Sequence, residues 1–98
     1  MFEIEKFTFD GKSFQGMKST IPGTTAPLLL VKGDKGFVMC GFLNMDAAER
    51  IGVAAAMVSG VNSFDDVFNA KIKAVTSKAK ELGVDVGQVV KEVIGKLS

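Results

Sequence analysis

The first positions of the chain form two mixed runs of apolar and polar residues that meet at a tight turn. These runs flank Asp10-Gly11. An Asp-Gly pair between such runs is a strong hairpin signal, because glycine tolerates the positive φ that a two-residue turn requires. The register set by this turn places Phe7 opposite Phe14 and Ile4 opposite Met17. The pattern therefore predicts an antiparallel hairpin.

A second hairpin is predicted where two short runs are apolar at every position. Residues 28–31 and 37–40 flank a turn over residues 33–36, which begins and ends with glycine. With this turn as the tip, Leu29 lies opposite Cys40. Strands that are apolar on both faces are typical of the centre of a covered sheet. We therefore expect both strands to be central and covered on their two faces.

Capping residues predict the next elements. Asn44 can cap a short helix over residues 45–51, and the glycine that follows ends it. Residues 54–58 are apolar and predict a buried strand, although their composition also permits a helix. Ser63 followed by acidic residues is close to a capping box and predicts a short helix over residues 64–70.

The C-terminal third is predicted to be helical. Apolar residues spaced three or four apart predict one helix over residues 71–82, ended by Gly83. A last helix is expected over residues 87–97. Its buried side would carry Val89, Val90, Val93, Ile94 and Leu97.

Together these elements predict an α+β fold built as a two-layer sandwich. The N-terminal antiparallel hairpins belong to a mixed sheet of about five strands, and three to four helices fall mostly in the C-terminal half. With 98 residues, the chain is expected to form a single domain over residues 1–98.

The composition of the chain indicates which kinds of binding partner to expect. The hydrophobic fraction of 47% is high for so short a chain and predicts burial of apolar surface against a second copy, as a homo-oligomer. A net charge of +1 argues against nucleic acid as a partner. No apolar run approaches the roughly 18–20 residues that span a bilayer, so no membrane segment is expected. One cysteine permits no internal disulfide, and we expect a cytoplasmic protein with a reduced thiol.

The residue types that are missing exclude several kinds of chemistry. The chain has no histidine, so neither a Cys-His nor a Ser-His-Asp nucleophile can be built. A structural zinc site needs four nitrogen or sulfur ligands, and one cysteine is present. We therefore expect no metal, no cofactor and no catalytic residue, and we favour a protein that is not an enzyme.

Cys40 supports two interpretations. It lies near the end of a strand that leads into a helix start, and a helix N-terminus can lower the pKa of a thiol and make it reactive. Its neighbours are apolar, however, and a free cysteine most often packs as a small buried hydrophobe. We favour the buried interpretation and retain the reactive thiol as an alternative.

A ligand site is predicted at one edge of the sheet. If strands 37–40 and 54–58 run parallel, joined by helix 45–51, their carboxyl ends meet at the same edge, where open α/β sheets tend to bind ligands. Acidic residues already occupy the starts of the adjoining helices and oppose an anion, so we expect a neutral or cationic small molecule. The predicted ligand-binding residues are Cys40, Gly41, Asn44, Ser59, Gly60, Asn62 and Ser63.

Three segments carry a resemblance to a known family. They are KGDKGFVMCGFLN, the following AAAMVSGV, and FDDVFNAKIKAVTSKAKELGVDVG. In these segments the chain resembles the YunC-like family, which consists of small uncharacterised bacterial and archaeal proteins regarded as a domain of unknown function. The resemblance implies a compact two-layer α+β fold. It implies no activity and no catalytic residues.

Three classes of function therefore remain open. The favoured class is a non-catalytic module that binds a small ligand or works through self-association. The second is a thiol-dependent enzyme or redox protein that uses Cys40. The third is a weak binder of nucleic acid.

Overall fold

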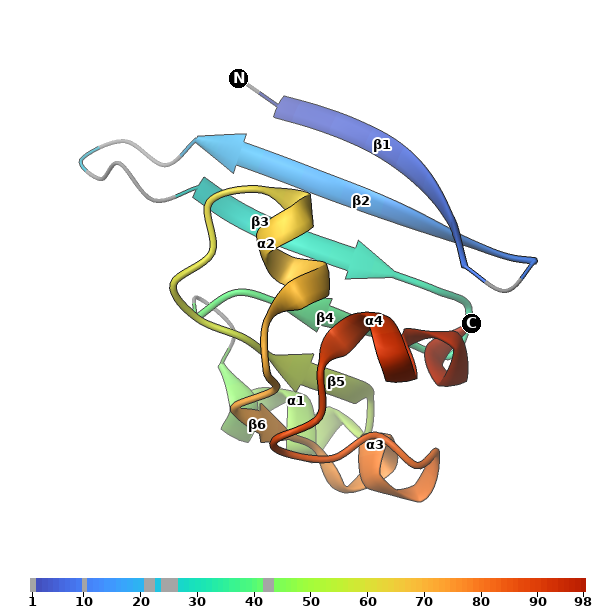
Figure 1. The fold of residues 1–98 in the computed structure, drawn as a ribbon. Helices are drawn as coiled ribbons and strands as arrows, with labels where there is room; N and C mark the ends of the chain where they lie inside the picture. Colours follow the sequence, from blue (N-terminus) through green and yellow to red (C-terminus); the bar gives the residue numbers. More distant parts are fainter. Residues whose placement is uncertain (1, 10, 21–22, 24–26, 42–43) are drawn as a thin grey trace.

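The computed structural model describes residues 2–9, 11–20, 23, 27–41 and 44–98. Their backbone forms one six-stranded mixed sheet with the strands in chain order (Figure 1). The strands are β1 (Phe2–Phe9), β2 (Lys12–Thr20), β3 (Pro27–Lys32), β4 (Gly36–Met39), β5 (Ala54–Met57) and β6 (Ala74–Val75). The helices are α1 (Met45–Ile51), α2 (Phe64–Asn69), α3 (Ser77–Glu81), α4 (Val90–Val93) and the 3₁₀ helix η1 (Ile94–Leu97). The predicted α+β fold is confirmed, with a short sixth strand added to the sheet.

The register predicted for the first hairpin is confirmed. In the antiparallel pairing of β1 with β2, Phe7 lies opposite Phe14 and Ile4 opposite Met17. Gly11 adopts a φ of 76°, which suits the turn, while Asp10 lies outside the described residues. The short turn therefore determines which side chains of both strands share a face.

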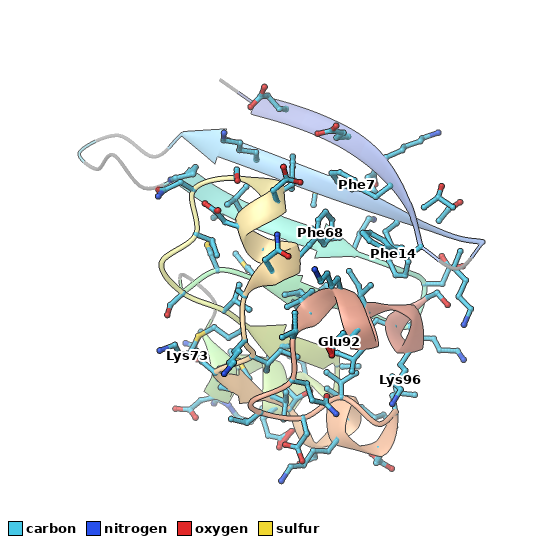
Figure 2. All side chains as sticks on the ribbon, viewed as in Figure 1. Phe7, Phe14, Phe68, Lys73, Glu92 and Lys96 are labelled. Atoms are coloured by element: carbon cyan, nitrogen blue, oxygen red, sulfur yellow. The ribbon has the colours of Figure 1, made fainter. Side chains whose placement is uncertain are left out.

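Aromatic side chains fill the space between this hairpin and α2. Phe7 contacts Phe64 and Phe68 edge-on, with ring centroids 5.1 and 4.9 Å apart. Phe9 lies 4.8 Å from Phe68 and 6.0 Å from Phe14 by the same measure. Figure 2 shows Phe7, Phe14 and Phe68 gathered between the strands and the helix. This cluster joins the N-terminal hairpin to the helical layer.

Gly16 of β2 is explained by the same cluster. A Cβ atom at this position would lie 2.7 Å from ring atoms of both Phe7 and Phe64. The pairing of β1 with β2 runs without interruption past this residue. Glycine is therefore needed here because two aromatic rings approach the backbone closely.

The prediction of a helix over residues 71–82 is wrong for the first half of this segment. This part of the chain runs extended instead, and β6 pairs antiparallel with β5. The N–H of Lys73 donates to the carbonyl of Met57 at 2.8 Å, and the N–H of Thr76 donates to the carbonyl of Ala55 at 3.0 Å. The backbone groups of β5 need partners on this side, and that requirement outweighs a helical spacing of apolar residues. The second half is helical as predicted, in α3.

The last predicted helix begins later than expected. Gly87 has a φ of 89° and lies in a turn, and residues 87–90 then pair with residues 70–72. Helix α4 then begins at Val90 and continues as η1. Four of the five side chains predicted to be buried here are buried, and Val89 is partly exposed.

The two faces of the sheet are covered differently. Helices α2 and α4 lie in front of the sheet in Figure 1, whereas α1 lies behind its β5 end. The inner side chains of β3 and β4, including Leu29, Val31 and Val38, are buried in the main core. On the outer face, Leu30 and Phe37 remain partly exposed. The expectation that both central strands are covered on two sides therefore holds for one face only.

Within the parts of the chain that the structure describes, no helix combines the length and apolar character needed to cross a membrane.

Candidate functional site

The predicted parallel pairing of β4 with β5 is present, with Met39 opposite Met57 at the carboxyl ends. Beyond these ends the surface forms a hollow of about 370 Å³, which we call the strand-end hollow. Its lining residues are Pro27, Cys40, Gly41, Ser59, Gly60, Val61 and Asn62. The structure thus brings together five of the seven residues predicted from the sequence.

The other two predicted residues serve as helix caps and do not line this hollow. The side-chain oxygen of Asn44 accepts a hydrogen bond from the N–H of Ala47 at 3.1 Å, at the start of α1. The hydroxyl of Ser63 accepts from the N–H of Asp66 at 3.2 Å, at the start of α2. Both side chains therefore satisfy backbone donors of their own helices.

Cys40 forms a buried wall of the hollow. Its side chain is 4% exposed, and its N–H donates to the carbonyl of Leu29 at 3.1 Å, as in an antiparallel ladder. The return bond of that ladder is replaced, because the N–H of Leu29 donates to Sγ of Cys40 at 3.4 Å. The thiol in turn faces the carbonyl of Pro27 at 4.0 Å. The sulfur thus substitutes for a backbone acceptor where the strand pairing ends.

The loop on the other side of the hollow is held by α2. The carboxylate of Asp66 accepts a hydrogen bond from the N–H of Asn62 at 3.0 Å. Together with the cap formed by Ser63, this bond fixes the loop relative to the helix start. Among the described residues that line the hollow, none carries a charged side chain. The polar groups here are those of Ser59, Asn62 and the glycine backbones.

A larger hollow of about 590 Å³, the turn hollow, lies at the opposite ends of β4 and β5. It is lined by residues 32–37, 52–54, 78, 81 and 82, and its charged side chains are exposed lysines and carboxylates of mixed sign. Exposed charges of this kind are screened by water and bind weakly. The strand-end hollow combines apolar walls with a few uncharged polar groups, which is more typical of a small-molecule site.

One carboxylate outside both hollows, that of Glu49, has a pKa shifted from its ordinary value. Glu49 on α1 accepts hydrogen bonds from the hydroxyl of Ser77 and from its N–H, the latter at 3.1 and 3.2 Å to the two oxygens. These bonds, the hydroxyl first, lower the pKa of Glu49 below its ordinary value. The contact joins α1 to the first residue of α3. Among the described residues, no three histidine, cysteine or acidic side chains are grouped so as to hold a metal ion.

Sequence reasoning missed Pro27 and Val61 as lining residues. A usable signal was present for Pro27, because it lies two residues before Leu29 in β3 and therefore on the same face as the residue predicted opposite Cys40. No comparable signal identified Val61, whose apolar side chain is buried in the main core as well as lining the hollow.

Known proteins match this chain in fold and over nearly its whole length. The crystal structure of a protein of unknown function, TA1206 from Thermoplasma acidophilum, is 39% identical, with a TM-score of 0.95. That similarity covers 100% of this chain and 94% of the other. An uncharacterized protein from Bacillus subtilis (strain 168), YunC, is 29% identical over 99% of this chain and 98% of its own length. The resemblance to the YunC-like family is therefore confirmed. The family model described as Domain of unknown function (DUF1805) matches residues 39–97, and the chain belongs to this family.

Proposed function

We propose that this protein is a non-catalytic module that binds an uncharged small molecule in the strand-end hollow. The observation that supports this most directly is the lining. Pro27 and Val61 supply apolar walls, and Ser59 and Asn62 supply uncharged polar groups, around a volume of about 370 Å³. Small-molecule sites typically occupy about 300–1,000 Å³ with such a mixture, so the hollow suits a small ligand.

The glycines support the same proposal. Gly41 has open space around the position of a Cβ atom, so a ligand can approach its backbone closely. The neighbouring Gly60 also lines the hollow, with a φ of 70°. The backbone N–H and carbonyl groups at such positions are the natural partners of an uncharged polar ligand.

An anionic ligand is disfavoured by the surrounding charge. Asp65 and Asp66 occupy the first turn of α2, and Asp46 occupies the first turn of α1. Carboxylates at these positions already interact with the helix dipoles and repel a second anion. No lysine or arginine lies among the described lining residues to offset them.

The alternative of a thiol-dependent enzyme is disfavoured by the surroundings of Cys40. A nucleophilic thiol needs exposure and a group that favours the thiolate. Here the residue is 4% exposed, and no cationic side chain lies among the described residues that line the hollow. We assign it the role of a wall. A free thiol also fits the cytoplasm, which is the compartment we propose for the protein.

A thermal-shift screen of uncharged metabolites and fragments, with nucleotides and metal salts alongside, tests the proposal. A compound at a hundred times its Kd stabilises the native state by about 2.7 kcal/mol, which raises Tm by about 11–22 °C in a domain of this size. We expect uncharged compounds to produce such shifts in the wild-type chain.

Two variants distinguish the hollows. Gly41→Leu places a side chain at the wall of the strand-end hollow without a clash at Cβ, and it should abolish the shift. Lys78→Leu changes a lining residue of the turn hollow and should leave the shift unchanged. A shift that survives Gly41→Leu and is lost in Lys78→Leu, or shifts confined to anions, would overturn the proposal.

A further inference from the structure

An apolar row crosses the outer face of the sheet at one level. The pairing registers place Ile4, Met17, Leu30, Met39 and Met57 opposite one another in turn across β1 to β5. Directly paired residues point to the same side of a sheet, so these side chains share one face. Ile4 is 57% exposed, and the other members are partly exposed. We call the part of this face over β1 to β4 the open face.

No helix in the described part of the chain covers the open face. Helices α2 and α4 lie on the inner face, and α1 lies behind the β5 end of the sheet (Figure 1). The outer side chain of β5, Ala55, is fully buried, whereas Leu30 and Phe37 on β3 and β4 are not. Strands that are apolar on both faces normally have cover on both. The open face is therefore the one apolar surface in the described sheet that lacks it.

We propose that a second copy of this chain packs against the open face, sheet to sheet, about a two-fold axis that runs along the strands. The first argument is area. Strands β1 to β4 lie about 4.8 Å apart and have 8, 9, 6 and 4 residues at about 3.4 Å each, so the open face projects roughly 440 Å². That projection is about half of the roughly 800 Å² of accessible surface that a standard interface removes from each partner, and side-chain relief and the flank of α1 add to it, so we expect a weak dimer.

The second argument is shape, and it fixes the direction of the axis. Helix α1 stands above β5 by about 10 Å, which is close to the spacing of two packed sheets. An axis along the strands reverses the strand order, so each α1 lies beside the β1 edge of the other copy. An axis along the apolar row would instead press the two α1 helices against each other. The favoured arrangement also covers β1, an exposed edge strand that proteins otherwise need to protect.

The third argument is complementarity of side chains. With the strand order reversed, Ile4 faces Met39 of the other copy and Met17 faces its Leu30. The next level of the sheet carries Lys6, Gln15, Lys32 and Phe37 on β1 to β4. Reversal places Lys6 opposite Phe37 and Gln15 opposite Lys32, so no two lysines meet. Flexible methionines in the apolar row adapt to such a contact.

Sedimentation velocity of the full chain tests the proposal. We expect a concentration-dependent dimer for the wild type. Leu30→Lys, at the centre of the open face, should weaken dimerisation at least about a hundredfold, because it buries an unpaired charge. Ile4→Lys on the exposed edge strand should also weaken it and carries little risk to folding, which far-UV circular dichroism checks. Val86→Lys is the matched control, because Val86 is 55% exposed and lies outside the sheet.

A cross-link tests the direction of the axis. Within one chain, positions 4 and 39 lie three strands apart, about 14 Å, which is too far for a disulfide. The double variant Ile4→Cys with Met39→Cys should therefore form covalent dimers on oxidation, whereas Val86→Cys should not. A wild-type monomer at all concentrations, a dimer insensitive to both lysine variants, or equal cross-linking by Val86→Cys would overturn the proposal.

Discussion

Thr76 connects the edge of the sheet to a helix, and its replacement by valine should be among the most costly single changes in the chain. The side chain is 1% exposed. Its hydroxyl donates to the carbonyl of Val53 at 2.7 Å and accepts from the N–H of Ala55 at 3.0 Å. It also accepts from the N–H of Ala79 at 3.4 Å, as the N-cap of α3. Valine has nearly the same shape and removes all of these bonds.

The expected loss follows from these contacts. A lost N-cap costs about 1 kcal/mol, and each buried backbone group left without a partner costs about 1–3 kcal/mol. The N–H of Ala55 and the carbonyl of Val53 both lose a partner, so we expect Thr76→Val to lower the free energy of unfolding by about 3–7 kcal/mol. A domain of this length has about 5–15 kcal/mol in total, so the variant should be marginally stable.

Urea unfolding followed by far-UV circular dichroism measures this loss, since the chain has no tryptophan or tyrosine for fluorescence. Thr76→Ser is the control. It keeps the hydroxyl and removes one buried methyl group, at a cost of about 1 kcal/mol. If valine and serine cost the same, or if valine costs less than about 1 kcal/mol, the hydroxyl does not have the structural role assigned to it.

Three further predictions concern other parts of the molecule. Gly16→Ala should lower stability by about 1–3 kcal/mol in urea unfolding, because its Cβ would collide with Phe7 and Phe64, whereas Gly41→Ala should change it by less than about 0.5 kcal/mol. Glu49 has a lowered pKa in the folded state, so its contribution is present above the ordinary glutamate pKa of about 4.3 and is lost as the pH falls through the lower, folded value. The urea midpoints of wild type and Glu49→Gln should therefore differ at pH 7 and converge in acid, and a constant gap would contradict this. Cys40 should react with a maleimide only as fast as the protein unfolds, with rapid reaction in urea as the positive control; rapid native labelling would restore the thiol-enzyme hypothesis.

Local signals in the sequence predicted much of the fold. The short turn at Gly11 pinned the register of the first hairpin, and the caps at Asn44 and Ser63 marked the starts of α1 and α2. Each of these features depends on residues close together in the chain. Their energetic preferences are therefore readable without knowledge of the tertiary structure.

The errors arose where distant parts of the chain decide the conformation. Ile72 and Val75 fit a helical spacing, but the backbone of β5 needed partners and drew this segment into the extended form. The pattern of Leu30 and Phe37 predicted cover on both faces of the sheet, whereas the described helices cover β3 and β4 on one face. That difference is the basis for the second copy proposed above.

The location of the candidate site could be predicted from the sequence, but the set of residues that line it could be predicted only in part. Parallel strands joined by a helix bring their carboxyl ends to one edge, which places Cys40 and Ser59 together whatever the details of the loops. The role of each polar side chain depends on nearby backbone donors. The side chains of Asn44 and Ser63 each accept a hydrogen bond from a backbone N–H of the helix that they precede. They therefore cap helices and do not line the hollow.

Amide chemical-shift mapping by NMR tests the proposed function most directly. The wild-type chain is titrated with the uncharged compound that gives the largest thermal shift, and Gly41→Leu is titrated in parallel. The account predicts that the largest changes occur at Gly41, Ser59, Gly60 and Asn62 and disappear in the variant. Changes centred on the turn over residues 33–36, or equal changes in wild type and variant, would contradict it.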